Sequence, residues 1–198
     1  MKWQRLAASA ALGLAAVAAL GLAAPAAAQI ANDGAAFVKA VRENDGSKAM
    51  ELIKSKTAAI TNARDDKGET GLVVAIARRD ETWTPFLLNQ GADPNLATRS
   101  GDTPLMTAAR SGYHEAAEWL LSARARVDAA NRSGETALIL AVQNRHSKLV
   151  KLLLSVGADP DKTDSVAGYS ARDYAKRDDR TPELLRAIEA ADPKKKTL

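Results

Sequence analysis

One short pattern, Gly-acid-Thr-x-Leu, occurs three times in this chain at a constant interval of 33 residues. It reads KGETGLVVAI at 67–76, SGDTPLMTAA at 100–109 and SGETALILAV at 133–142. A catalytic loop has no reason to be copied at fixed spacing, whereas a structural unit that stacks on copies of itself has one. The interval therefore predicts a row of similar units that share one core.

Each copy carries the sequence signals of two short helices. The first begins at a threonine N-cap, followed by proline in Thr103-Pro104, and ends at Ser111-Gly112. The second carries a pair of leucines, which recurs as Leu87-Leu88, Leu120-Leu121 and Leu153-Leu154. A high alanine content and only 4% aromatic residues favour closely packed helices over a sheet sandwich. One such unit cannot bury both of its helices, but a stack can.

On these motifs the chain resembles the ankyrin repeat family. Residues 98–130 and 131–163 match the family pattern closely, and residues 65–97 match it less well. The resemblance implies an all-α solenoid of stacked helix-turn-helix units with β-hairpin-like turns. We expect the repeat domain to span residues 29–192, followed by a basic tail at 193–198. The expected units lie at about 32–64, 65–97, 98–130, 131–163 and 164–192.

The first and last units are expected to be degenerate copies. In the first unit, one helix buries Phe37, Ala40 and Val41, and the next carries Ala49, Met50, Leu52 and Ile53. In the last unit, GYSARDYA at 168–175 repeats the helix start with one inserted residue. Thr181-Pro182 then begins a short amphipathic helix. Its inner face holds Leu184, Leu185 and Ile188, and its outer face holds Glu183, Arg186 and Glu189.

Unit 65–97 departs from the family pattern in its helices. Gly71 stands where the motif has proline, and Arg79 stands where it has glycine. Pro85 falls inside the expected second helix, so we expect this helix to begin late, capped by Thr82 or Thr84. In the next unit Arg124 also replaces a glycine. These departures are open to two interpretations, neutral drift or a binding site that costs stability.

The N-terminus has the features of a secretory signal peptide at residues 1–28. Lys2 and Arg5 precede an apolar stretch from Leu6 to Ala24, and Ala26-Ala27-Ala28 forms an A-x-A cleavage pattern that Pro25 is expected to present in extended form. We expect cleavage after Ala28 and a periplasmic or secreted monomer without stable membrane insertion. The alternative is an uncleaved anchor. The chain has no cysteine, so it has neither disulfides nor the acylated cysteine of a lipoprotein.

The sequence offers little to an enzyme. It has no thiol nucleophile and no Gly-x-Ser-x-Gly turn. His114 and His146 are the only histidines, and we interpret His146 as structural; a two-histidine metal site is the weaker alternative. Without Lys2 and Arg5 the chain has 26 basic against 24 acidic residues, too even a balance for nucleic-acid binding. We expect no catalytic residues, cofactor or metal.

The resemblance implies protein binding through a concave surface lined by the turn tips and the inner faces of the first helices. The corresponding tip residues are Asp66, Lys67, Glu69, Arg99, Ser100, Asp102, Arg132, Ser133 and Glu135. The corresponding helix positions are Ala77, Arg78, Arg110, Ser111, Gln143 and Asn144. Four arginines in this set suggest a partner with acidic or carbonyl-rich features.

Three functional classes follow. The leading one is a non-enzymatic scaffold or adaptor that binds a protein through its concave surface. The second is a dedicated immunity or stress-protection protein for one partner, and the third is a metal- or cofactor-handling protein. Because fold does not name a partner, the sequence leaves the identity of the bound protein open.

Overall fold

The computed structural model describes residues 23–191 except residue 56, and this part of the chain is a stack of helix pairs. The elements are α1 (Ala23–Glu43), α2 (Gly46–Ser55), α3 (Thr57–Thr61), α4 (Gly71–Ala77), α5 (Trp83–Asn89), α6 (Pro104–Ser111), α7 (His114–Ser122), α8 (Ala137–Gln143), α9 (Ser147–Ser155), α10 (Ala171–Arg177) and α11 (Pro182–Ala191). The all-α solenoid expected from the repeat is confirmed. Residues 1–22 and the basic tail lie outside the described residues.

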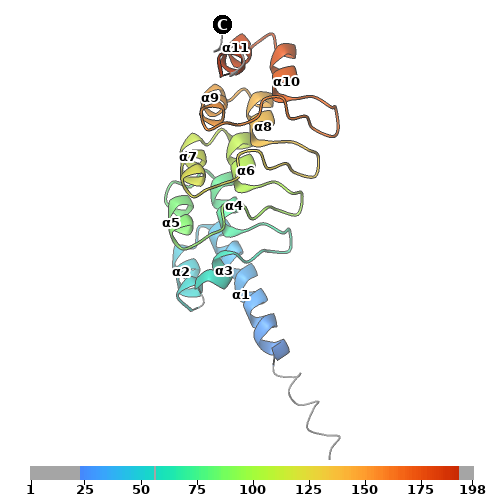
Figure 1. Ribbon diagram of the computed structural model, residues 1–198. Helices are drawn as coiled ribbons and strands as arrows, with labels where there is room; N and C mark the ends of the chain where they lie inside the picture. The colour runs from blue at the N-terminus through green and yellow to red at the C-terminus, as the bar shows by residue number, and fades with distance from the viewer. Residues whose placement is uncertain (1–22, 56, 192–198) are drawn as a thin grey trace, which may run out of the picture.

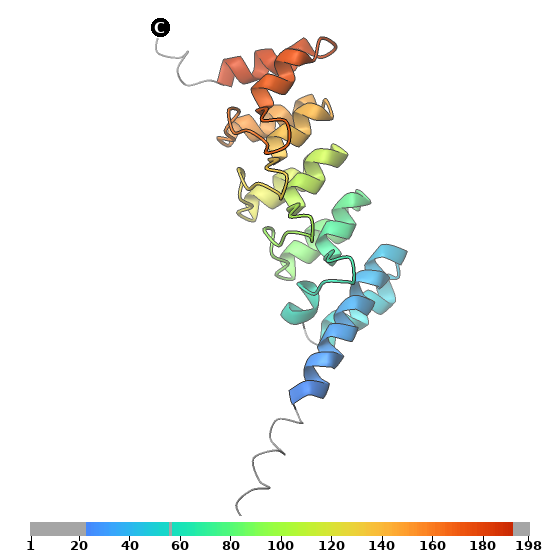
Figure 2. The same ribbon diagram turned by 90° about the vertical axis from the view of Figure 1, so that its right-hand side faces the viewer.

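The helices form two rows, as Figure 1 shows. The inner row runs through α4, α6, α8 and α10, and the outer row runs through α5, α7, α9 and α11, with each helix contacting the next in its row. A loop projects from the side of the stack before each inner helix (Figure 1, Figure 2). Isolated antiparallel bridges at Arg64–Thr70 and Thr163–Ser170 close two of these loops at their bases, as β-hairpin-like turns should be closed.

The inner helices begin where the sequence predicts. Thr70, Thr103, Thr136 and Ser170 have extended backbones at the N-cap, and their side-chain oxygens accept from the N–H three residues ahead. Pro104 occupies the first position of α6, where its missing N–H has no partner to lose. Each such cap contributes about 1 kcal/mol to helix stability.

The core is built from residues that recur with the repeat. Leu72, Leu105 and Leu138 are each at most 1% exposed, and the alanines three residues after them are equally buried. Small side chains at these alanine positions let neighbouring helices approach closely. In the last unit Leu184 and Ile188 close the core, while Glu183 and Arg186 lie exposed as predicted and Glu189 is half-buried.

The residue between the two helices of a unit has a left-handed backbone. It is Asn44, Arg79, Gly112 and Arg145 in successive units, with φ between 56° and 71°. A second left-handed position follows each outer helix, at Gly91, Arg124 and Gly157. Arginine therefore adopts, at Arg79, Arg124 and Arg145, a conformation that glycine adopts at lower cost.

Helix α5 begins two residues later than the register of α7 and α9 predicts, which confirms the expected late start. Pro85 consequently falls in its first turn, where no N–H is needed. Thr82 holds the N-cap position but its side chain forms no capping bond. The cap predicted at Thr82 or Thr84 is instead supplied by Asp80, whose Oδ1 accepts from Thr82 N (3.0 Å) and Trp83 N (2.8 Å).

The interface between α5 and the next unit contains two buried hydroxyls that form no hydrogen bond within the described chain. They belong to Thr84, which is fully buried, and Tyr113, which is 1% exposed. The two groups lie close to each other but not in hydrogen-bond geometry. Burial also raises the pKa of Tyr113. At the position of Thr84 the following units carry Ala117 and Val150, which have no hydroxyl to satisfy.

The first unit differs from its expectation in two ways. It contains a third helix, α3, that no repeat motif indicates, and α1 runs without interruption across the expected cleavage site. Pro25 lies in the first turn of α1 instead of breaking it. Cleavage after Ala28 stays a prediction. Among the described helices, none is both long and apolar enough to span a membrane.

Gly71 is explained by its neighbour in the first unit. A Cβ at this position would lie 2.7 Å from Cε1 of Phe37, which is itself fully buried. The phenylalanine ring thus occupies the space in which a proline would sit in other units.

Candidate protein-binding surface

Four loops, here called the finger loops, project from one side of the stack, to the right in Figure 1. They comprise residues 65–69, 98–102, 131–135 and 164–169. Each is closed by a backbone hydrogen bond from its first residue to its last, at 3.0 Å in the first, third and fourth loops and 2.9 Å in the second. In three loops the first side chain, Asp65, Asn131 or Asp164, also accepts from N–H groups at the tip.

The last three finger loops are joined to one another. Arg132 N donates to Ser100 O at 3.2 Å, and Ser165 N donates to Ser133 O at 2.8 Å. Gly101 is needed for this contact, since its φ is 88° and a Cβ there would lie 2.9 Å from Arg132 N. These three loops therefore form a row whose spacing is fixed by backbone bonds, and the first finger loop lies beside them, with Gly68 packed against Arg99.

In the second and third finger loops, the acidic residue of the repeated Gly-acid-Thr motif accepts hydrogen bonds from side chains of the same chain. Asp102 is 9% exposed and accepts from Arg110 Nη1 (3.1 Å) and Asn131 Nδ2 (2.7 Å). Glu135 accepts from Asn131 Nδ2 at 2.9 Å. The sequence predicts an exposed contact at Asp102, whereas the structure buries it because it joins two neighbouring loops.

Glu69 of the first finger loop pairs with a residue of the preceding unit. Arg42 Nη2 lies 2.7 Å from Glu69 Oε2 and also donates to Asp65. Burial alone would raise the pKa of Asp65, but the hydrogen bond from Arg42 and backbone N–H donors hold that pKa below its usual value. Glu69 is thus half-buried and already paired.

Several predicted helix positions are also engaged internally. Arg78 donates to the carbonyls of Val41, at 3.2 Å, and of Arg42, and so satisfies the C-terminal end of α1. Ser111 Oγ donates to Thr107 O at 3.0 Å, and Asn144 Nδ2 donates to Leu140 O at 2.8 Å. Ala77, Arg110 and Gln143 are exposed.

The remaining predicted residues lie at the tips of the finger loops. Asp66, Lys67, Arg99, Ser100 and Arg132 are exposed, and Ser133 is half-buried. Within the described chain neither Arg99 nor Arg132 forms an ion pair. These two arginines occupy the same place in consecutive loops and, together with Lys67 of the first loop, are basic charges that the row presents to solvent.

The residues whose side chains fix the finger loops in position were not predicted from the sequence. They are Arg42, Asp65, Asn131, Asp164 and Tyr174. The Tyr174 hydroxyl donates to Asp164 Oδ2 at 2.6 Å. Burial would raise the pKa of Asp164, but this bond and backbone donors lower it. A signal was available: positions 65, 98, 131 and 164, again 33 apart, are Asp, Thr, Asn and Asp, all side chains that can accept from backbone N–H.

A second set of hydrogen bonds between neighbouring units lies at the far ends of their outer helices. Asn62, Asn95 and Asp128 accept from the backbone N–H of Asp93, Arg126 and Asp159, at 2.8, 2.7 and 2.9 Å. Asn62, Asn95 and Asp128 are 33 residues apart in the sequence, so one position of the repeat forms a row of side-chain bonds between units.

His146 has the structural role that was predicted. Its ring packs against Gly112, and its Nε2 lies 3.3 Å from Arg110 O of the preceding unit. His114 begins α7, with Nδ1 3.8 Å from Glu118 Oε2. Across the described residues, no group of three or more His, Cys, Asp or Glu side chains is placed to hold a metal ion.

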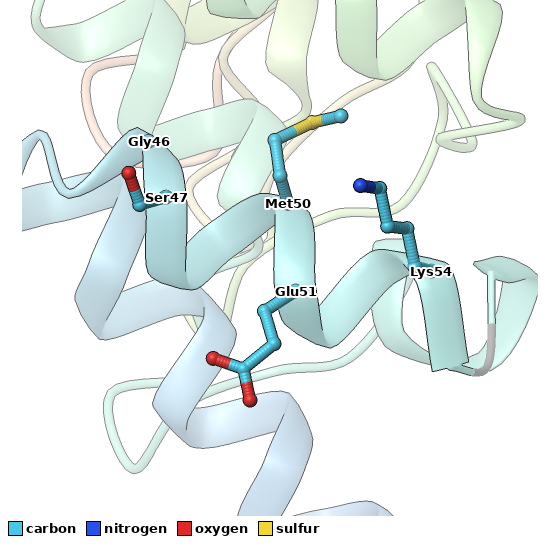
Figure 3. Close-up of a pocket in the computed structure, with 5 residues that line it drawn as sticks. All are labelled: Gly46, Ser47, Met50, Glu51 and Lys54. Carbon is cyan, nitrogen blue, oxygen red and sulfur yellow. The ribbon is translucent and has the colours of Figure 1, made fainter.

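An open hollow of roughly 740 Å³ lies beside α2. Figure 3 shows Met50 and Lys54 extending on one side of this helix, with Glu51 pointing away. The residues that line the hollow come from α2 alone. Gly46 lies at its edge, where an added Cβ would be 3.7 Å from the ring of Trp83. A surface with walls from a single helix has no convergent polar groups to define a ligand site.

The family model described as ankyrin repeats, in three copies, matches residues 34–131 and again 84–164. The chain belongs to the ankyrin repeat family. It is also similar to the mitochondrial disaggregase of Homo sapiens, with 29% identity over 112 residues, which cover 57% of this chain and 15% of the disaggregase. The chain thus spans about 15% of that relative's length. Ankyrin repeats form a protein–protein interaction module, and this chain has the stack that such a module requires.

Proposed function

We propose that this protein is an exported, non-enzymatic scaffold or adaptor that binds a protein partner along its finger loops. The observation that carries the proposal is the row of finger loops, of which the last three are joined by backbone bonds, with exposed polar side chains at the tips. A row that is already ordered loses little conformational entropy when a partner binds. The expected location is the periplasm or the exterior, after removal of residues 1–28.

The binding residues are the exposed ones at the tips, with Arg99 and Arg132 at the centre. Because neither arginine forms an ion pair within the described chain, both favour a partner with acidic or carbonyl-rich segments and an association that weakens with salt. Arg78 and Arg110 belong to the framework, since each is already bonded to its own chain. The metal-handling alternative gains no support from His146, which packs between two units.

The test is affinity capture from an extract of the source cells, comparing the parent protein with the Arg99→Ala/Arg132→Ala variant. The variant is expected to lose the captured protein. The matched control is Lys148→Ala/Lys151→Ala, which removes two exposed positive charges from the outer face of α9 and should capture as the parent does. Equal capture by the Arg99/Arg132 variant would remove the finger loops as the binding surface.

A further inference from the structure

A polar cleft of about 340 Å³ lies between the C-terminal ends of α8 and α10, two neighbours in the inner row. Gln143 and Arg145 form one wall, Tyr174 and Arg177 form the other, and residues 178–180 close it. Gln143 belongs to the set of helix positions predicted to bind a partner, although it lies at the C-terminal end of α8 and outside the finger loops.

Arg145 and Asp178 form a neutral pair at one end of this cleft. Arg145 Nε lies 2.8 Å from Asp178 Oδ2, and Nη2 lies 3.2 Å from Oδ1, a fork on both carboxylate oxygens. Asp178 also accepts from the Thr181 hydroxyl at 2.9 Å and from Arg180 N at 3.1 Å. Its charge is balanced and its oxygens are engaged, so it does not repel an incoming anion strongly.

Arg177 is held in place in the free protein. Its guanidinium lies 4.6 Å from the centroid of the Tyr169 ring, and its Nη1 donates to the Tyr169 hydroxyl at 2.9 Å. The remaining N–H groups of this planar fork match the two oxygens of a carboxylate. Because the side chain is already ordered, it loses little entropy on binding.

The charges that remain in the cleft are positive in balance. Arg177 and Arg180 are both exposed, and Asp179 is the one acidic lining residue without a hydrogen-bonded cation. The Tyr174 hydroxyl donates to Asp164 and accepts from the Gln143 side chain, so the Gln143 amide, which has two N–H groups, keeps one of them as a further donor. We infer that this cleft binds the carboxylate of an acidic side chain on an extended segment of the protein partner, with Arg177 as its principal donor. The inference rests on the proposed function.

The experiment is an NMR titration of the ¹⁵N-labelled protein with three capped peptides at constant ionic strength. The probe is acetyl-Gly-Glu-Gly-amide, its neutral twin is acetyl-Gly-Gln-Gly-amide, and the chain-end probe is acetyl-Gly-Gly-Gly with a free carboxylate. The Glu peptide should give saturable shifts of the Arg177 Nε–H and Gln143 amide signals. The Gln peptide should bind at least tenfold more weakly.

Arg177→Gln should weaken the Glu peptide at least tenfold, and Arg177→Lys, which keeps the charge but loses the fork, should do so in part. Arg186→Gln, on the outer face of α11, removes the same charge from the same unit and should change nothing. Arg180→Gln is a second variant, which removes the other exposed positive charge of the cleft. The Arg180 side chain forms no hydrogen bond or ion pair in the described chain.

Three results would overturn the inference. The first is that the Gln peptide binds as well as the Glu peptide. The second is that the Arg186 control weakens binding as much as the Arg177 variant, and the third is that the chain-end probe binds tenfold more tightly than the Glu peptide. If the peptides fail while capture still depends on Arg99 and Arg132, the cleft loses its role and the proposed function stands.

Discussion

At the scale of residues, the left-handed position between two helices connects each unit to the next. At Gly112 the space is filled by the ring of His146. Arg79 places its guanidinium 5.5 Å from the centroid of the Tyr113 ring, and Arg145 forks onto Asp178. Arginine in this conformation costs about 1 kcal/mol, and its contact with the following unit acts in the opposite direction. The departure from the family pattern at Arg79 therefore has a structural role.

Gly112→Ala is expected to lower the free energy of unfolding by about 2–3 kcal/mol, from a left-handed alanine and from overpacking. The added Cβ would lie 2.6 Å from Cε1 of His146. Gly91→Ala is the control, because Gly91 has φ 82° but nothing within 4 Å of the built Cβ, so it should lose about 1 kcal/mol. Chemical denaturation measures both; equal losses would contradict the steric part of this explanation.

Asp178 makes the last unit sensitive to acid. Its bond to Arg145 lowers its pKa from 3.8 to about 2. A depressed carboxyl pKa gives stability that is present above the unfolded-state pKa of about 4 and is lost as the pH falls towards 2. The melting temperature of Asp178→Asn should therefore lie below that of the parent at pH 7, by a gap that shrinks between pH 4 and pH 2.

The control for this comparison is Asp179→Asn, since the Asp179 carboxylate acts on Arg145 only through space. Its gap from the parent should be smaller at pH 7. A gap for Asp178→Asn that does not change with pH would show that the pair does not stabilise the fold through charge.

At the scale of elements, the unit of α4 and α5 is the irregular member of the stack. Its outer helix is shortened by Pro85 and capped from Asp80, and its interface with α7 contains the two hydroxyls without hydrogen-bond partners. Each buried hydroxyl left unpaired costs about 1–3 kcal/mol. The neighbouring units, with Ala117 and Val150 at the equivalent position, avoid this cost.

Thr84→Val should raise the free energy of unfolding by about 1 kcal/mol, because it removes an unpaired buried hydroxyl at nearly constant volume. Thr136→Val is the same chemical change at an equally buried site, but there the hydroxyl caps α8 by accepting from Ile139 N at 3.3 Å. That variant should lose about 1 kcal/mol. Denaturant unfolding should therefore show changes of opposite sign in the free energy of unfolding of the two variants. A destabilised Thr84→Val would mean that the hydroxyl is bonded.

The elements were predictable where their signals are local. Threonine caps, the Leu pairs and the late start of α5 follow from residues within a few positions of each other. The loop contacts were not predictable from one motif, because Asn131 and Asp102 are 29 residues apart and belong to different units. For the same reason the motif could not show that Asp102, Glu69 and Arg78 are engaged with neighbouring units. Helix α3 escaped prediction because it matches no part of the repeat.

At the scale of the whole molecule, two sets of hydrogen bonds join successive units. The last three finger loops are joined on one side, and the bonds to Asn62, Asn95 and Asp128 join the units on the other. Each unit contacts only its neighbours, so a rigid loop row depends on every interface along the stack. The row is the feature that the molecule as a whole adds to its separate helix pairs.

The central claim is that the finger loops are the surface that a partner covers. Amide hydrogen exchange of the protein, with and without the partner obtained by capture, tests it most directly. We predict slower exchange in the partner's presence at residues 66–68, 99–101 and 132–134, with the outer faces of α5, α7 and α9 unchanged. Protection confined to those outer helices, with the finger loops exchanging as in the free protein, would contradict the claim.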